Sequence, residues 1–250
     1  GPPGSTFGVM VTGAHRDLGS GDPLGALLTR NAVTLSGDSV LRLWGGDYEL
    51  QSAGGITHVD GDTGAIDRQQ RAVARYLQRP DADYVHYDPT RRSMTGGKSG
   101  AVFERRNGRR WLWQAETLWE FPEFDPTDIG RSTTTDGVIA RGYVEYRDTE
   151  PSRWRRNYSF RATTTNEWNF GWVAQGHSLQ PRVLVTWPNF WETQVTVNLA
   201  ARTQNHSLTR GGPSMEEPKG WRTNLRLQNS GAAQTRGVLE GAYGRNEDGG

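Results

Sequence analysis

The chain has 250 residues, a length that suits one large β domain or two small domains. Its 29 basic and 28 acidic residues nearly cancel, so the chain lacks the basic excess that would indicate a nucleic-acid partner. It has no cysteine, which excludes disulfides and cysteine metal ligands. Mean hydropathy is −0.75, yet there are 32 glycines, 10 tryptophans and 8 tyrosines, a composition typical of β structure with many turns.

The amino-terminal half is predicted to hold strands at 6–16, 38–44 and 95–106 and one helix between them. Residues 63–78 read TGAIDRQQRAVARYLQ, and Pro80 lies just beyond that run. Its apolar residues recur at helical spacing: Ala65, Ile66, Ala72, Val73, Tyr76 and Leu77. We therefore expect one helix over 63–78, which either occupies the interior of a barrel or packs on the face of a sheet.

Apolar and polar residues alternate through most of the carboxyl-terminal half. In 153–164, for example, Trp154, Tyr158 and Phe160 alternate with charged or polar residues. A period of two with one apolar face predicts strands. The predicted runs are 110–117, 138–147, 153–164, 192–202 and 221–229. Long polar connections are expected at 120–131 and 203–220, and hairpin turns at Asn107-Gly108 and 229–233.

Two structures account for this alternation. In a soluble sandwich the polar face meets bulk water, whereas in an outer-membrane barrel it lines a wet interior while the apolar face meets lipid. Runs of about 10 residues suit a tilted membrane strand. Tryptophans also fall near run ends, as in the aromatic girdles of such barrels; these are Trp111, Trp187, Trp191 and Trp221.

A carboxylate-rich stretch, YLQRPDADYVHYDPT, spans 76–90 and raises the question of a site. Its Asp81, Asp83 and Asp88 lack the spacing of a calcium loop and follow the predicted helix end, so a structural loop explains them best, ahead of ligand contact or catalysis. No histidine pair has zinc spacing. We predict no metal and no cofactor.

Several aromatic residues suit either sugar stacking or membrane anchoring. Trp172, Trp187 and Trp191 are the candidates for stacking on a glycan, since stacking needs exposed rings. The same three residues could instead be membrane-interface anchors or part of a core, and this interpretation is favoured over stacking because interfacial tryptophans have a ready cause in the membrane–water boundary.

Several segments in their order resemble a bacterial family of outer-membrane-associated β-barrel domains of unknown function. These are HVDGDTGAIDRQQRAVARYLQRPDA (58–82), YDP (87–89), TGG (95–97), EFDPTDIG (123–130), LTRGGPSMEEP (208–218) and the following Trp221. The resemblance runs from about Phe7 to the end. The family usually has an Asn-Asp pair where this chain has Thr127-Asp128, which leaves the role of residue 127 in doubt.

The resemblance implies a fold and a location but no activity. In the family the barrel usually follows a carbohydrate-binding-family-nine-like (DOMON-like) domain, which would lie upstream of Gly1. We therefore expect residues 1–250 to be one antiparallel β-barrel domain, a piece of a longer exported protein of the bacterial outer membrane. Its partners would be outer-membrane lipid and glycans, with no nucleic acid and an oligomeric state left open.

The residues expected to contact a ligand or line the interior are Arg79, Asp81, Asp83, Asp88, Asp128 and Arg210. We expect the carboxylates of 81–88 to pair with strand arginines such as Arg141, Arg155 or Arg161. The predicted function is binding or uptake of glycans or nutrients at the cell envelope. The alternatives are a soluble carbohydrate-binding module and, third, a hydrolase using carboxylates among Glu116, Glu120, Asp125 and Asp128; no catalytic residue is assigned.

Overall fold

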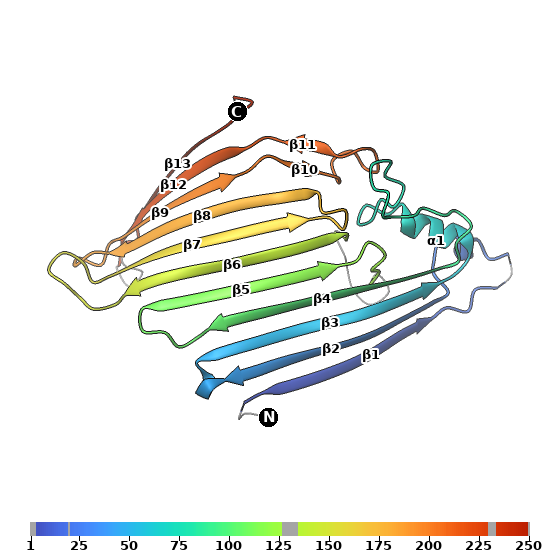
Figure 1. Cartoon of the computed structure of the whole chain (residues 1–250), viewed down its shortest axis with the longest axis horizontal. Helices are drawn as coiled ribbons and strands as arrows, with labels where there is room; N and C mark the ends of the chain where they lie inside the picture. The colour runs from blue at the N-terminus through green and yellow to red at the C-terminus, as the bar shows by residue number, and fades with distance from the viewer. Residues whose placement is uncertain (1–3, 20, 127–134, 230–233, 250) are drawn as a thin grey trace.

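The protein is built on a single layer of antiparallel strands with one short α-helix at an end of the layer (Figure 1). The computed structural model describes residues 4–19, 21–126, 135–229 and 234–249. The main sheet has eleven strands in the order β1-β2-β3-β4-β5-β6-β7-β8-β9-β12-β13, and β10 pairs with β11 in a second, small sheet.

The main-sheet strands are β1 (Thr6–His15), β2 (Asn31–Leu43), β3 (Tyr48–Asp60), β4 (Ser93–Arg105), β5 (Trp111–Glu120), β6 (Gly137–Asp148), β7 (Asn157–Trp168), β8 (Ala174–Thr186), β9 (Glu192–Ala200), β12 (Gly220–Gln228) and β13 (Val238–Asn246). The other elements are β10 (Thr203–Asn205), β11 (Met215–Glu217), the helix α1 (Thr63–Gln70) and the 3₁₀ turns η1 (Pro23–Ala26) and η2 (Trp44–Gly46).

Strand residues make up 55% of the chain and helical residues 6%, so the predicted all-β antiparallel class is confirmed. The predicted closure into a barrel is not shown, because β1 and β13 are the two edges of the sheet and do not pair with each other in the part of the chain described. None of the described helices has the length and apolar character needed to cross a membrane.

Connections differ in length between the two ends of the sheet. One end, the loop end, carries 61–92, 169–173 and 201–219 and the described parts of two further connections, 16–19 with 21–30 and 121–126 with 135–136. The opposite end, the turn end, carries 44–47, 106–110, 149–156, 187–191 and 229–237. Because every neighbouring pair in the main sheet is antiparallel, β1 and β13 both run from the turn end to the loop end.

The two faces of the sheet differ in chemistry, since successive side chains of a strand point to opposite faces. In β9, Val195 and Leu199 point to one face and Gln194 and Asn198 to the other. The register continues each face across the sheet. The apolar face includes Val9, Val11, Val33, Leu35, Ile56, Phe103, Val144, Phe160, Leu179, Val183, Val195, Leu199 and Leu225.

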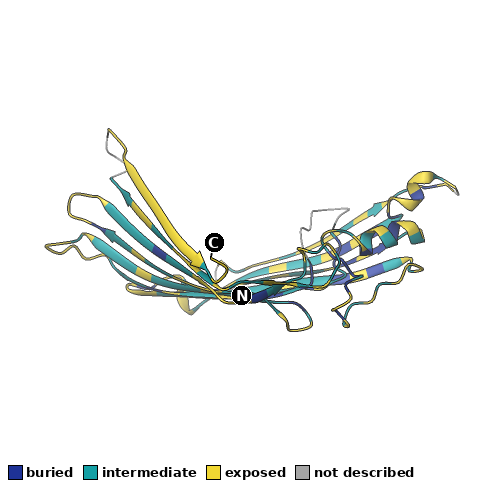
Figure 2. Cartoon of the chain, turned by 90° about the horizontal axis from the view of Figure 1, so that it is seen from above, coloured by how far each residue is buried: buried dark blue, intermediate teal, exposed yellow. Residues whose placement is uncertain are grey.

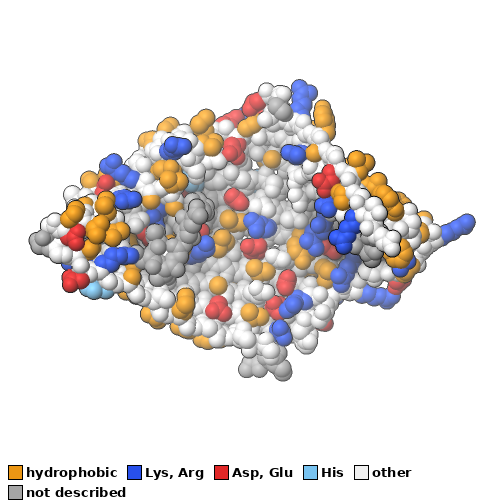
Figure 3. Space-filling model, turned by 180° about the vertical axis from the view of Figure 1, so that it is seen from behind, with side chains coloured by type: hydrophobic (Ala, Val, Ile, Leu, Met, Phe, Trp, Pro, Cys, Tyr) orange, Lys and Arg blue, Asp and Glu red, His pale blue; other side chains and the backbone are white. Residues whose placement is uncertain are grey.

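The opposite, polar face carries charges of both signs. Among them are Glu49, Lys98, Glu116, Arg141, Glu145, Arg161, Arg182, Arg222, Arg226 and Glu240. Figure 3 shows acidic and basic side chains spread over the hollowed middle of this face. The charged residues that the register places on the apolar face all lie at or beside strand ends; they are Asp60, Arg105, Asp148 and Arg245.

Aromatic rings gather at both ends of the strands. At the turn end, Phe103 and Trp113 lie edge to face with centroids 5.1 Å apart, and Tyr48 joins them. At the loop end, Phe121 and Phe170 lie 4.8 Å apart. Further contacts are Trp111–Tyr146 and Trp154–Trp187 at the turn end, and Trp119–Trp172, Trp168–Trp172 and Trp221–Tyr243 at the loop end.

No second layer of strands covers the apolar face in the part of the molecule described, and Figure 2 shows one curved layer. The accessible surface is 14923 Å², whereas a compact monomer of 27.8 kDa would expose roughly 11,000 Å². Large apolar side chains account for part of the excess: Val11 is 67% exposed, Leu35 52% and Leu179 45%. The sheet therefore leaves an apolar surface uncovered across its width.

The helix α1 packs on the polar face at the loop end, where that face turns locally apolar. Ile66 is fully buried against Ala32, Val59 and Met94, which point to the polar face of β2, β3 and β4. Burying an isoleucine side chain contributes about 1.5–3 kcal/mol. This small core fixes the helix to the loop end of the sheet.

The helix is shorter than predicted: it ends at Gln70, not at residue 78. Beyond it the Leu77 N–H donates to the Gln70 carbonyl, and Tyr76 adopts a left-handed φ of 47°, which closes the chain into turns. Arg75 is buried there in an ion pair with Asp125. The apolar residues of 72–77, whose spacing predicted a helix, thus lie in a compact turn that the ion pair between Arg75 and the distant Asp125 holds in place.

Candidate functional site

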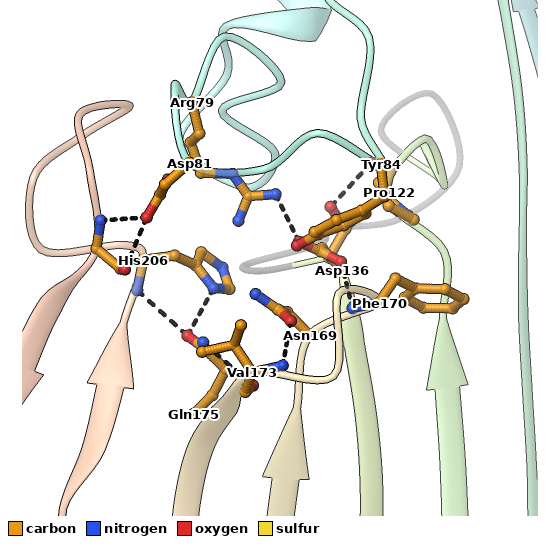
Figure 4. Close-up of polar contacts among 12 residues, drawn as sticks. Arg79, Asp81, Tyr84, Pro122, Asp136, Asn169, Phe170, Val173, Gln175 and His206 are labelled. Atoms are coloured by element: carbon orange, nitrogen blue, oxygen red, sulfur yellow. Dashed lines mark hydrogen bonds and ion pairs between the residues drawn. The ribbon is translucent and has the colours of Figure 1, made fainter.

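The segment 71–92 crosses the loop end and meets three other connections there. It contacts the 121–126 segment and the 206–214 loop directly, and Asp136 links it to the turn 169–173 by accepting hydrogen bonds from both Tyr84 and the Phe170 N–H (Figure 4). We call the meeting point, centred on Arg75, Arg79, Asp81, Asp125 and Asp136, the loop junction. It brings together parts of the RPD, EFD and TRGGP segments that carried the family resemblance.

A buried ion pair between Arg79 and Asp136 forms the centre of the loop junction. Arg79 Nη2 lies 2.5 Å from Asp136 Oδ2, and the two side chains are 1% and 0% exposed. The Tyr84 hydroxyl donates to the same Oδ2 at 2.6 Å, and the Phe170 N–H donates to Oδ1 at 3.0 Å. Desolvation and the neighbouring Asp136 carboxylate raise the pKa of Tyr84, so it stays a neutral donor.

A second buried pair joins Arg75 to Asp125 at 2.7 Å, with both side chains 1% exposed. Arg75 also donates from Nε and Nη2 to the Phe124 carbonyl at 3.2 and 3.0 Å. The Asp125 N–H donates to Thr57 Oγ1 of β3 at 3.0 Å. Desolvation lowers the pKa of Arg75, and Asp125 opposes this shift. The pair therefore fastens the crossing segment to the connection after β5.

Glycines permit the close approach of these connections. A Cβ on Gly96 would lie 2.2 Å from the Phe124 backbone nitrogen, and one on Gly171 would lie 2.6 Å from Tyr84 Cε1. Neither separation is compatible with a side chain, so both positions require glycine. The turn after β5 and the turn after β7 can therefore pack where they do.

The 206–214 loop docks on the crossing segment through Asp81. The Ser214 N–H and hydroxyl both donate to Asp81 Oδ2 at 2.7 Å. Desolvation raises the pKa of Asp81, but the two Ser214 hydrogen bonds and the Arg79 charge outweigh it and hold that pKa below its usual value. Asp81 therefore stays ionised at neutral and mildly acidic pH.

His206 holds the other end of this loop. Its Nδ1 lies 2.7 Å from Gln175 Oε1 of β8, and its backbone N–H donates to the same oxygen at 3.2 Å. An amide oxygen only accepts, so Nδ1 carries the ring proton. Desolvation, and then the Arg79 charge, lower the pKa of His206. The docked loop therefore favours the neutral imidazole.

Docking of the 206–214 loop is expected to weaken as the pH falls below about 6.5, the unperturbed histidine value. Because docking lowers the pKa of His206, the imidazole binds a proton more readily in the undocked loop. The free energy that favours docking is therefore fully present above about pH 6.5 and is lost as the pH falls below that value. Limited proteolysis of 206–214 at pH 7.5 and 5.5 measures this. The variant His206→Gln should show the same cleavage at both values, and equal cleavage of the wild type would contradict the assignment.

Some buried polar atoms of the loop junction have unused hydrogen-bonding capacity. Arg79 Nε and Nη1, Gln78 Oε1 and Thr209 Oγ1 have no hydrogen-bond partner among the residues described. Their types, mostly donors beside one acceptor, suit a water or hydroxyl group. The arrangement can bind and orient polar groups, but it pairs no nucleophile with a base.

The structure separates the predicted ligand residues. Arg79 and Asp81 lie in the loop junction, whereas Asp83 is exposed and Asp88 accepts from the Thr90 N–H and hydroxyl at 2.8 and 2.7 Å. Arg210 is exposed on the docked loop, with φ of 54°. Asp128 lies outside the described residues.

The predicted partners of these carboxylates are wrong. Asp81 takes its bonds from Ser214, and the strand arginines pair with carboxylates on or beside neighbouring strands. Arg141 pairs with Glu116, Arg155 with Asp148 and Arg161 with Glu145. Arg141 and Arg161 lie on the polar face beside carboxylates of neighbouring strands, and Arg155 lies in the 149–156 turn at the opposite end of the sheet, so Asp81 finds its hydrogen bonds within the loops.

The three stacking candidates do not form one site. Trp172 is 63% exposed at the loop end against Trp119 and Trp168. Trp187 and Trp191 lie at the turn end, where Trp187 Nε1 donates to Thr193 Oγ1 at 2.8 Å. All three sit among the aromatic residues at strand ends, which favours the anchoring alternative for them.

Asp128 lies outside the described residues, and the other three carboxylates considered for hydrolysis each have a basic partner. Glu120 lies 3.1 Å from Lys98 Nζ, Glu116 lies 3.8 Å from Arg141, and Asp125 is held by Arg75. In the described ranges no three His, Asp or Glu side chains lie close enough to hold a metal ion.

Four members of the loop junction escaped the sequence reasoning: Arg75, Tyr84, Asp136 and His206. Arg79 and Asp136 are 57 positions apart, and no spacing rule links them. One signal in the sequence could have indicated them: Arg75 and Arg79 lie within an apolar stretch. Arginines that become buried need a carboxylate partner, so two acidic residues from elsewhere in the chain were to be expected. A search of protein-family models returns no match for the chain, and no curated protein sequence matches it either.

Proposed function

We propose that this sheet is the wall of a bacterial outer-membrane β-barrel, with its apolar face against lipid and its polar face toward a wet interior. The observation that carries the proposal is the two-sided sheet: its apolar face bears charges only at or beside strand ends, and its other face bears many charges of both signs. A charged side chain on the lipid face costs about 2–4 kcal/mol at the bilayer midplane, which explains where charges are placed.

The ends of the strands support the same proposal. Outer-membrane barrels carry aromatic girdles at both interfaces, short turns on one side and longer loops on the other. Here aromatic pairs occur at both ends, and the longest connections, 61–92 and 201–219, lie at one end. Lipid does not tolerate unpaired strand edges, so the proposal requires further strands between β1 and β13.

The polar face offers room for a hydrophilic solute. A hollow of about 650 Å³ lies over β2, β3 and β4, where small residues such as Ser36, Ala53, Gly55 and Gly100 line it. Thr34, Gln51, Asp38, Lys98 and Glu116 add hydroxyl, amide and charged groups of both signs. Val40, Val102 and Leu118 also line the hollow and make part of its surface apolar. Sugars carry both hydroxyl groups and apolar ring faces, so we propose glycans or related nutrients as the solutes handled.

The barrel is tested by expressing the full-length protein with its own export signal and fractionating the envelope. We expect recovery in the outer membrane and a gel mobility that changes on boiling, because a closed barrel resists detergent until heated. Sugar uptake into proteoliposomes then tests the solute class. A soluble protein with the same mobility before and after boiling would overturn the proposal.

A further inference from the structure

An apolar pocket opens at the loop end, between the apolar face and the crossing segment. Its volume is about 570 Å³, within the range of ligand sites in proteins. The lining includes Ile56, Leu77, Tyr84, Val85, Phe121 and Phe170. It adjoins the loop junction through Tyr84 and Phe170, but the charged groups of the junction do not line it.

The floor of the pocket lacks side chains because Gly96 and Gly97 of β4 form it. Gly96 is required by the close packing of the Phe124 backbone, but Gly97 is not: a Cβ there would meet Phe121 Cδ2 at an ordinary 3.7 Å. Gly97 points to the apolar face, beside Ile56, which is 57% exposed. The nearest atom to that Cβ would be the Gly55 carbonyl oxygen at 3.4 Å, also an ordinary contact, so position 97 tolerates a side chain, and a larger one there would lie against Phe121 of the pocket wall.

A few polar side chains also line the pocket, among them His86, Thr95 and Glu123. Arg91 binds Glu123 through two hydrogen bonds of 2.7 Å. Among the described lining residues there is no lysine or arginine, and the nearby Arg91 is already paired with the Glu123 carboxylate. A free fatty acid would lack a partner for its charge, whereas a lipid whose head group stays outside needs none.

We propose that this pocket binds one acyl chain of a membrane lipid, with the chain entering from the apolar face and the head group at the Glu123–Arg91 pair. The inference rests on the proposed membrane function, because it takes the apolar face to meet lipid. The Phe121–Phe170 pair, 4.8 Å between centroids, forms an aromatic wall at the level where girdle residues meet the interface. Phe121 is 45% exposed, so a bound chain would cover it.

Photocross-linking tests the site in the full-length protein. The protein is folded into phosphatidylethanolamine–phosphatidylglycerol vesicles that contain a phospholipid with a diazirine near the end of one chain. Cross-links are mapped by peptide mass spectrometry. We expect them to concentrate at 84–86 and 121–123, and to be lost in Gly97→Leu and in Val85→Trp, which fill the pocket from floor and wall.

Ala101→Leu is the matched control, because it adds the same side chain to the same strand and face outside the pocket. Its cross-links at 84–86 and 121–123 should persist. Each variant is first checked for the boiling-dependent mobility. Cross-links spread evenly along the apolar face of a folded barrel, or unchanged by both pocket-filling variants, would overturn the lipid site alone. Loss of the mobility change in the wild type would overturn the barrel and this site together.

Discussion

Leu179→Arg is expected to destabilise the protein in membranes by about 2–4 kcal/mol. Leu179 lies near the middle of β8 on the apolar face, 45% exposed, with Thr164 and Leu199 beside it. In lipid, the new guanidinium has no water and no facing carboxylate. Denaturant titration in lipid vesicles, read by the boiling-dependent mobility, gives the change in free energy of unfolding.

Gln180→Arg is the matched control, since the next residue has nearly the same depth but points to the polar face. There Gln180 Nε2 donates to Asn198 Oδ1, and an arginine would remain in a wet interior. We expect a change within about 0.5 kcal/mol, as for most surface substitutions. Equal effects of the two arginines would contradict the assignment of lipid and interior to the two faces.

Arg79→Ala is expected to cost about 3–5 kcal/mol at the loop junction, because it leaves the Asp136 carboxylate buried without its cation. Asp136 would keep only the Tyr84 hydroxyl and the Phe170 N–H. Since Arg79 joins no strand ladder, the loss should appear as local opening of the crossing segment. Hydrogen exchange of residues 71–92, compared with exchange of the strands, measures it.

Arg71→Ala is the control in the same segment. The Arg71–Asp67 pair has side chains 56% and 30% exposed, and Arg71 also donates to the Tyr87 hydroxyl in an exposed contact; exposed polar pairs of this kind contribute little to stability. Exchange in 71–92 should therefore change little. If Arg79→Ala opened the segment no more than Arg71→Ala does, the buried pair would not be what holds the crossing segment.

The strands best predicted from the sequence are those with strict alternation, as in β7, β9 and β12. β3 and β8 were not predicted. β3 carries Gly54 and Gly55 at its centre, and β8 carries Pro181, residues that weaken a strand pattern. The β8–β9 pairing is interrupted at 180–181, the place where Pro181 has no N–H to donate.

The loop junction was only partly predictable. Of the residues predicted to contact a ligand or line the interior, Arg210 is exposed on the docked loop, whereas Arg79 and Asp81 lie in the junction. Their partners depended on folding of three separate connections across the loop end, which local spacing does not encode. The helix was overextended for the same reason: Arg75 has a buried partner 50 positions away, in Asp125, and tertiary pairing overrode local propensity.

The shared direction of β1 and β13 restricts how the sheet can be completed. Both edges point from the turn end to the loop end. A second copy in the same membrane orientation could offer either edge only a parallel partner. Antiparallel completion instead needs an odd number of added strands, of which the first and the last run from the loop end to the turn end. Added to the eleven strands of the main sheet, they give a closed barrel with an even number of strands. Any segment proposed to join β1 to β13, whatever its source, must therefore contribute an odd number of strands.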